Sequence, residues 1–167
     1  MTLAYIGLGS NLGDREDNLN NALNMLSQSA RIVAISPIFL SEPEIYKDQP
    51  DFLNSVARVD TNCTALELLK ILNGIEAQMG RERTYAGAPR IIDLDLLFFG
   101  KDIISQPGLD VPHPRLHLRA FVLAPMAEIA PDFIHPALHK SVRELLIDLK
   151  PGYRIEKWES NTGRGKD

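Results

Sequence analysis

One stretch of twelve residues, 89–100, constrains the fold more than any other part of the chain. Its sequence is Pro-Arg-Ile-Ile-Asp-Leu-Asp-Leu-Leu-Phe-Phe-Gly, the pattern of a buried strand that contains two acids. Side chains alternate along a strand, so Asp93 and Asp95 lie on one face while Leu94 and Leu96 lie on the other. The apolar face predicts attachment to a core. The acidic face must then meet a cavity or solvent.

The two acids predict a site for a divalent metal ion. Residues at positions i and i+2 of a strand are about 6–7 Å apart at the backbone, and like charges at that distance raise a pKa or recruit a cation. Mg²⁺ prefers oxygen ligands and keeps coordination positions for substrate phosphates. The simpler alternative is a pair of solvated acids balanced by Arg90. The apolar residues that flank Asp93 and Asp95 favour the metal site.

Length and composition limit the range of functions. A chain of 167 residues with 44% hydrophobic residues suits one globular domain, expected over 1–158, with a flexible tail over 159–167. Neither a basic leader nor an apolar run of about 20 residues is present, so we expect a cytoplasmic protein that does not bind membranes. The net charge of −4 offers no general attraction to nucleic acid. An anionic substrate therefore requires a local basic cluster.

Such a basic cluster directly precedes the acidic strand. Arg81, Arg83 and Arg90 belong to a loop that also contains Gly and Ala. The planar guanidinium group of arginine matches two phosphate oxygens at once. A solvated basic loop is the usual alternative, but the position beside the two acids favours phosphate binding.

The remaining periodicities predict an α+β fold. In chain order, strand and helix patterns alternate over 3–8, 14–27, 31–36, 52–60 and 64–79, before the acidic strand. The order β-α-β-β-α-β predicts a ferredoxin-like split βαβ core, an antiparallel sheet with helices on one face. Phe52 and Asn54 would then join the acids on the helix-free face. An aromatic ring and an amide suit a flat polar ligand, although an aromatic that merely covers a sheet fits equally well.

The chain after residue 100 predicts a C-terminal α/β extension. We expect a helix over 117–129 that is broken near Pro125, and a short helix that begins at the capping box of Ser141. An edge strand is expected over 153–158. The segment 41–51 is longer than a hairpin connection requires, which is typical of functional loops.

Four sequence blocks, in this order, resemble one enzyme family. The blocks are 9–13, 48–54, 88–96 and the pair formed by 111–113 with 119–121. Together they are similar to the 6-hydroxymethyl-7,8-dihydropterin pyrophosphokinases of folate biosynthesis, and the resemblance runs collinearly over roughly residues 3–135. One difference lies at Gly87, where many members of the family carry a tryptophan that belongs to a lid. Tyr85 is a candidate replacement.

The resemblance implies a Mg²⁺-dependent transferase, a 2-amino-4-hydroxy-6-hydroxymethyldihydropteridine diphosphokinase. It would move diphosphate from ATP to the hydroxymethyl group of the dihydropterin and release AMP. ATP and the pterin would be its small-molecule partners, with two Mg²⁺ ions bridging the ATP phosphates. We expect a monomer that binds no nucleic acid.

The resemblance also implies the roles of individual residues. Asp93 and Asp95 would bind the metal ions and act in catalysis together with Arg81 and Arg90. The positions expected to contact ATP are Glu76, Arg81, Arg83, Arg90, Leu96, His113 and Arg119. The positions expected to form the pterin pocket are Pro43, Ile45, Phe52, Asn54, Asp93, Asp95 and Phe121. Phe52 and Phe121 would sandwich the ring while Asn54 hydrogen-bonds to its polar edge.

Two other kinds of function stay open at this point. Nucleotidyl transfer also suits a sheet that carries two carboxylates and metal ions, although the negative net charge disfavours a polymeric nucleic acid as substrate. A non-enzymatic ligand-sensing module would explain the fold, but it leaves Asp93, Asp95 and the basic loop without a role.

Overall fold

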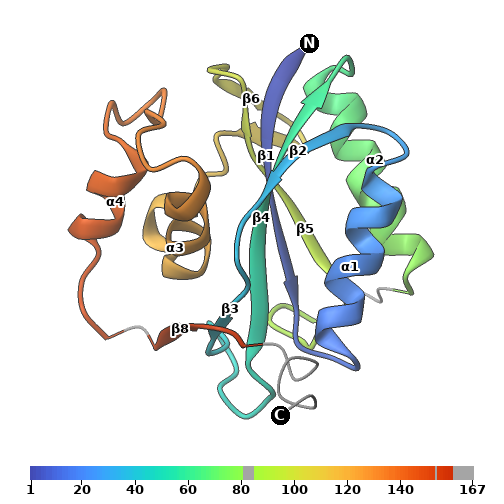
Figure 1. Ribbon diagram of the computed structural model, residues 1–167, viewed down its shortest axis with the longest axis vertical. Helices are drawn as coiled ribbons and strands as arrows, with labels where there is room; N and C mark the ends of the chain where they lie inside the picture. Colours follow the sequence, from blue (N-terminus) through green and yellow to red (C-terminus); the bar gives the residue numbers. More distant parts are fainter. Residues whose placement is uncertain (81–84, 153, 160–167) are drawn as a thin grey trace.

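The computed structural model describes residues 1–80, 85–152 and 154–159, which form a mixed α/β fold (Figure 1). The strands of the main sheet are β1 (Thr2–Ser10), β2 (Arg31–Ile35), β3 (Phe39–Ser41), β4 (Phe52–Thr61), β5 (Asp93–Phe99) and β8 (Ile155–Lys157). A separate hairpin consists of β6 (Ile104–Gln106) and β7 (Leu109–Val111). The α-helices of the described residues are α1 (Arg15–Leu26), α2 (Ala65–Gln78), α3 (Ala120–Ile129) and α4 (Val142–Asp148), with a 3₁₀ turn at Leu116–Leu118 before α3. None of these helices is both long and apolar enough to cross a bilayer.

The main sheet is antiparallel throughout. Its strand order is β5-β1-β4-β3-β8, and β2 also pairs with β4. Strands β2 and β3 are successive segments along one edge of β4, separated at Pro37, which has no N–H group to donate. The Ser36 hydroxyl fills part of the gap by accepting a hydrogen bond from the Val56 N–H at 2.8 Å. The three-residue strand β3 was not predicted, whereas β8 confirms the expected edge strand.

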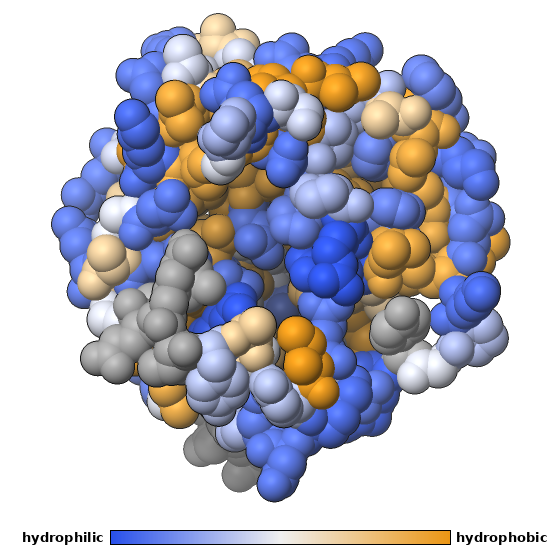
Figure 2. Space-filling view, turned by 180° about the vertical axis from the view of Figure 1, so that it is seen from behind, coloured by the Kyte–Doolittle hydropathy of each residue, from blue (hydrophilic) through white to orange (hydrophobic). Residues whose placement is uncertain are grey.

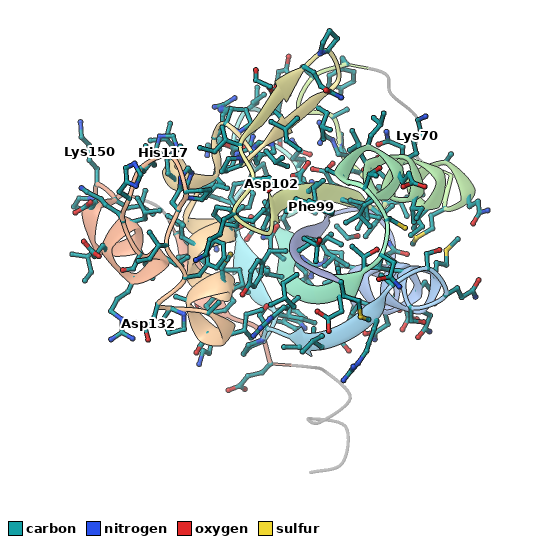
Figure 3. The ribbon with its side chains drawn as sticks, turned by 90° about the horizontal axis from the view of Figure 1, so that it is seen from above. Lys70, Phe99, Asp102, His117, Asp132 and Lys150 are labelled. Atoms are coloured by element: carbon teal, nitrogen blue, oxygen red, sulfur yellow. The ribbon has the colours of Figure 1, made fainter. Side chains whose placement is uncertain are left out.

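Each face of the sheet carries its own hydrophobic core. On the first face, Ile6, Leu94 and other apolar residues pack against α1 and α2, as the alternation of β1 and β5 predicts. On the second face, Tyr5, Val56 and Phe98 pack against α3 and α4. Figure 3, seen from above, shows the sheet in the middle with one pair of helices on either side.

The expectation of a helix-free second face is therefore wrong. Helix α3 is apolar on nearly all sides, so it buries itself on the sheet instead of showing an amphipathic pattern. The expected break near Pro125 is also wrong, because α3 continues through this residue. Proline removes one backbone hydrogen bond, and the burial of Leu123 and Met126 on both sides of it holds the helix together.

A bulge in β5 separates the acidic end of the strand from its apolar end. Ile6 pairs with Leu96 and Tyr5 pairs with Phe98, so Leu97 is an extra residue without a partner on β1. Leu97 and Phe98 consequently both face the second core. The strand can therefore place two acids at one end and two apolar side chains at the other on the same side of the sheet.

The caps of the helices follow the sequence closely. Thr64 and Ser141 form the predicted capping boxes that start α2 and α4, and Asp14 caps α1. Trp158, which follows β8, donates a hydrogen bond to Glu16 of α1 at 3.0 Å and so ties the last described residues to the body of the protein.

Residues 160–167 lie outside the described part of the chain. The domain limits of 1–158 and 159–167 stay predictions.

Candidate active site

A pocket with a volume of about 270 Å³ lies where β1, β4 and β5 run side by side. The strands contribute Gly7 and Gly9, Phe52 and Asn54, and Asp93 and Asp95. The loops over 42–49 and 86–90 and the beginning of α3 complete its walls. Figure 2, which shows the molecule from behind, displays a hollow with strongly hydrophilic residues inside and hydrophobic residues near its rim.

The two acids face this pocket, as the alternation of the strand predicts. Gly9 pairs with Asp93 and Gly7 pairs with Asp95, so the neighbouring strand places no side chain beside either carboxylate. The Arg90 guanidinium contacts the Asp93 carboxylate at 2.9 Å. The pKa of Asp95 is raised to about 7, chiefly by the loss of hydration on burial and secondly by repulsion from Asp93. The positive charges of Arg119 and Arg90 oppose this shift without cancelling it.

These properties fit a site for a hard divalent cation. A half-buried carboxylate with a raised pKa gains stability when a cation neutralises its charge, and Asp95 is held beside a second carboxylate. Within the described residues, no group of three or more His, Cys, Asp or Glu side chains surrounds a common point. Two carboxylates leave most of the coordination shell of Mg²⁺ to water and to ligand oxygens, which is the usual arrangement where Mg²⁺ binds together with phosphates.

Three arginines of the described residues line the pocket. Arg90 and Arg119 were predicted, whereas Arg115, which follows Pro114, was missed. Arg119 forms an ion pair with Glu44 at 3.2 Å and lies 5.4 Å from the centre of the Phe121 ring. The pocket therefore combines negative charge on β5 with positive charge on its walls. The predicted Arg81 and Arg83 lie outside the described residues.

Three residues expected to contact ATP do not line the pocket. Glu76 is buried in α2 and accepts a hydrogen bond from the Leu94 N–H at 2.9 Å, which fixes β5 next to the acids. Leu96 lies in the core beneath α1 and α2. The backbone N–H of His113 donates a hydrogen bond to the Leu97 carbonyl. The pKa of the His113 side chain is lowered to about 4, chiefly by burial and secondly by the positive charge of Arg119. Their contacts with ATP stay predictions.

The residues expected to bind the pterin all line the pocket. They come from the loop after β3, from β4, from β5 and from α3, and they are Pro43, Ile45, Phe52, Asn54, Asp93, Asp95 and Phe121. Asn54 is buried and its amide nitrogen donates to the Ser41 hydroxyl at 2.7 Å. Two aromatic rings, an amide and the acids thus border one cavity, which is the chemistry that a flat polar ring with an attached hydroxyl group requires.

The loop over 42–51 and the loop that precedes β5 meet over the pocket. Tyr46 and Tyr85 contact each other edge to face with ring centres 5.7 Å apart. The Gln49 side chain donates to the Gly87 carbonyl at 2.9 Å. Gly87 has a φ of +81°, and a Cβ atom at this position would lie 2.9 Å from the Ile45 Cβ, so only glycine fits. Tyr85 therefore supplies an aromatic side chain to the loop that lacks the tryptophan.

Asn11 joins both loops to β1 and was not recognised as a site residue. Its amide nitrogen donates to Gln49 at 2.8 Å, and its amide oxygen accepts from the Arg90 N–H at 2.7 Å. The only sequence signal for this role is that Asn11 and Gln49 belong to two of the four blocks of the resemblance. Asn11 consequently sets the distance between the loop over 42–51 and the basic segment before β5.

Comparisons with known proteins agree with this geometry. The family model for 7,8-dihydro-6-hydroxymethylpterin-pyrophosphokinase (HPPK) matches residues 5–131. A 2-amino-4-hydroxy-6-hydroxymethyldihydropteridine pyrophosphokinase of Pseudomonas aeruginosa is 43% identical over 134 residues, which cover 79% of this chain and 83% of that protein. The protein of the same name from Bacillus subtilis is 44% identical over 129 residues, which cover 76% of this chain and 77% of that protein.

Longer proteins also match. The folic acid synthesis protein FOL1 of Dictyostelium discoideum is 37% identical over 153 residues, but these cover 92% of this chain and only 23% of that protein. The wild-type HPPK-DHPS structure of Plasmodium falciparum shares the fold, with a TM-score of 0.72 and 16% identity over 87% of this chain and 44% of that chain. The chain thus spans less than half of these longer proteins.

The family match runs from Tyr5 within β1 through both loops of the pocket and β5 to the end of α3, and so covers the parts of these elements that line the pocket. The bacterial relatives match over most of their own length. The chain therefore belongs to the 7,8-dihydro-6-hydroxymethylpterin-pyrophosphokinase family.

Proposed function

We propose that this protein transfers diphosphate from ATP to the hydroxymethyl group of 6-hydroxymethyl-7,8-dihydropterin, in the synthesis of folate. The products are the pterin diphosphate and AMP. The observation that carries the proposal is that one pocket combines the paired carboxylates of Asp93 and Asp95 with the ring and amide of Phe52 and Asn54. A binding site for a flat heterocycle thus lies next to a site for a cation and phosphates.

The pterin ring binds between the aromatic side chains of Phe52 and Phe121. Stacking holds the plane of the ring, while the buried Asn54 hydrogen-bonds to its polar edge and fixes its rotation within that plane. The hydroxymethyl group then points toward Asp93 and Asp95. The support for this arrangement is that all five side chains border the same cavity.

Asp93 and Asp95 are the proposed ligands of Mg²⁺, with two ions expected. Bound by these carboxylates, Mg²⁺ would supply positive charge that neutralises the phosphates during the transfer. Arg90 contacts the Asp93 carboxylate, which keeps its guanidinium next to the position of the phosphates. Arg115 and Arg119 provide further positive charge in the wall of the pocket. Arg81 and Arg83 are proposed to contact ATP as well.

The transfer forms one bond and breaks another. The hydroxymethyl oxygen attacks the β-phosphorus of ATP, the bond from that phosphorus to the oxygen of the α-phosphate breaks, and AMP leaves with the electron pair. The hydroxyl proton is released. The protein contributes chiefly by positioning the two substrates and by compensating charge, because phosphoryl-type transfer needs little covalent help.

We also infer that the core has the ferredoxin-like arrangement. The order β5-β1-β4-β2 with antiparallel pairing supports it, since this is the order in which the strands of a split βαβ fold lie side by side. The monomeric state and the cytoplasmic location expected from the sequence stay predictions.

The proposal is tested by incubating the purified protein with ATP, Mg²⁺ and 6-hydroxymethyl-7,8-dihydropterin and separating the nucleotides. AMP that forms only when the pterin is present, and that disappears with a chelator, is the expected result. Folded protein that binds both ligands without forming AMP would instead favour a ligand-sensing module.

A further inference from the structure

Ser41 lies in the pocket but has no part in the function as described so far. It ends β3 directly before the loop over 42–51, only 6% of its surface is exposed, and its hydroxyl accepts the hydrogen bond from the Asn54 amide at 2.7 Å. Asn54 itself is only 4% exposed. Both partners border the pocket, so their hydrogen bond is part of its wall.

The position of the Asn54 oxygen shows which end of the amide is turned toward the ligand. The amide nitrogen is turned to Ser41, and the oxygen lies on the side of Gly9, the residue that pairs with Asn54 across the sheet. A Cβ atom at Gly9 would lie 3.0 Å from this oxygen. Because Gly9 has no side chain, the oxygen stays open to the pocket as a hydrogen-bond acceptor.

An amide without a fixed partner presents its two ends with nearly equal ease, because oxygen and NH₂ have almost the same shape. If the NH₂ end of the amide faces an N–H group of the ligand, both groups are donors. No hydrogen bond forms between them, and a buried polar group is left unpaired. The pocket can therefore distinguish ring edges only if a neighbour holds the amide of Asn54 in place. Within the described residues, Ser41 is the side chain that contacts this amide through a hydrogen bond.

We propose that Ser41 is a positioning residue that holds the Asn54 amide oxygen toward the bound ring, so that the pocket selects a ring edge carrying an N–H donor. The inference rests on the proposed function, because it names how that pocket recognises its heterocycle. Ser41 acts through Asn54 and takes no part in the transfer of diphosphate.

The test compares Ser41→Thr with Ser41→Val. The two replacement side chains have the same shape, and only threonine keeps the hydroxyl. The dissociation constant of 6-hydroxymethyl-7,8-dihydropterin is measured by calorimetry with Mg²⁺ and a non-hydrolysable ATP analogue, and KM and kcat are measured with ATP. We expect about a tenfold weaker pterin affinity for valine and a change within about twofold for threonine. The kcat at saturating pterin and the KM for ATP stay close to those of the wild type.

Two further variants separate positioning from packing. Ser36→Ala removes another buried hydroxyl that bonds to β4, outside the pocket, and it should lower stability without changing pterin affinity. In an Asn54→Ala background, the valine and threonine variants at position 41 should bind pterin equally, because the amide that Ser41 holds is gone.

The possible outcomes are distinct. Equal pterin affinity of the valine and threonine variants would overturn the role of Ser41. A loss of pterin affinity in the Ser36→Ala protein as large as that in the Ser41→Val protein would overturn it too. A difference between valine and threonine that persists without the Asn54 amide would overturn it as well. Wild-type protein that forms no AMP would instead refute the proposed function itself.

Discussion

Replacing Asp95 by asparagine should stabilise the metal-free protein while abolishing turnover. The carboxylate is held in a half-buried position next to Asp93, and the loss of hydration together with the repulsion from Asp93 raises its pKa from 3.8 to about 7. An acid whose pKa is higher in the folded state binds a proton more tightly there than in the unfolded chain. Ionising Asp95 at neutral pH therefore costs folding free energy, and asparagine avoids that cost.

The size and sign of the effect on the free energy of unfolding follow from the shift in pKa. Between about pH 4 and pH 7 the unfolded state has lost the proton that the folded state still holds. The free energy of unfolding therefore falls by about 1.4 kcal/mol for each unit by which the pH rises. The full shift corresponds to about 4 kcal/mol of folding stability. The wild type has all of this stability below pH 4 and has lost it above pH 7. Since Asp93 shares the repulsion, we expect Asp95→Asn to gain about 2–4 kcal/mol at pH 8, or roughly 5–10 °C in melting temperature.

The assay is calorimetric unfolding in a chelator at pH 5 and pH 8. The advantage of Asp95→Asn should be small at pH 5 and large at pH 8. Added Mg²⁺ should raise the melting temperature of the wild type, more at pH 8 than at pH 6, and leave the variant unchanged. The control is Asp102→Asn, an exposed acid in the turn after β5 (Figure 3) that does not line the pocket, and this variant should match the wild type. A variant at Asp95 that melts no higher than the wild type at pH 8, or whose advantage is independent of pH, would refute the reasoning.

Three other changes probe the pocket and the second core. Phe52→Ala should weaken pterin binding by about tenfold or more with little change in the KM for ATP, and unchanged pterin affinity in a titration would exclude the stacking role. Gly9→Ala should lose more pterin affinity than Gly7→Ala, since a Cβ atom at Gly9 would lie 3.0 Å from the Asn54 oxygen, whereas at Gly7 it would make an ordinary contact of 3.5 Å. Burial, followed by the charges of nearby histidines, lowers the pKa of His135, so its contribution to stability is complete above about pH 6.5 and is lost as the pH falls. Chemical denaturation at pH 7 and pH 5 should show this loss, and a His135→Gln protein with the same pH dependence as the wild type would contradict it.

The sequence predicted the parts of the fold that depend on local periodicity. Alternation in β4 and β5 placed Phe52, Asn54, Asp93 and Asp95 on one face, because a buried face leaves little freedom of register. Capping boxes at Thr64 and Ser141 marked the beginnings of α2 and α4. These signals need only neighbouring residues.

Features that depend on distant contacts could not be predicted in this way. Helix α3 is apolar on nearly all sides, so its pattern gave no indication that it covers the second face of the sheet. The hydrogen bonds of Asn11 with Gln49 and of Ser41 with Asn54 join residues that lie 38 and 13 positions apart. Polar side chains of these types are common on surfaces, and only the folded loops show that these ones are site residues.

The most direct test of the account follows the phosphorus atoms of ATP. ATP labelled separately at the α- and γ-phosphates is incubated with the protein, Mg²⁺ and 6-hydroxymethyl-7,8-dihydropterin, and the products are separated. Diphosphate transfer predicts that the γ-label appears in the pterin product and the α-label in AMP. An α-label in the pterin product would indicate nucleotidyl transfer, and γ-label in the pterin together with ADP would indicate single phosphoryl transfer. Either result would contradict the function proposed for this pocket.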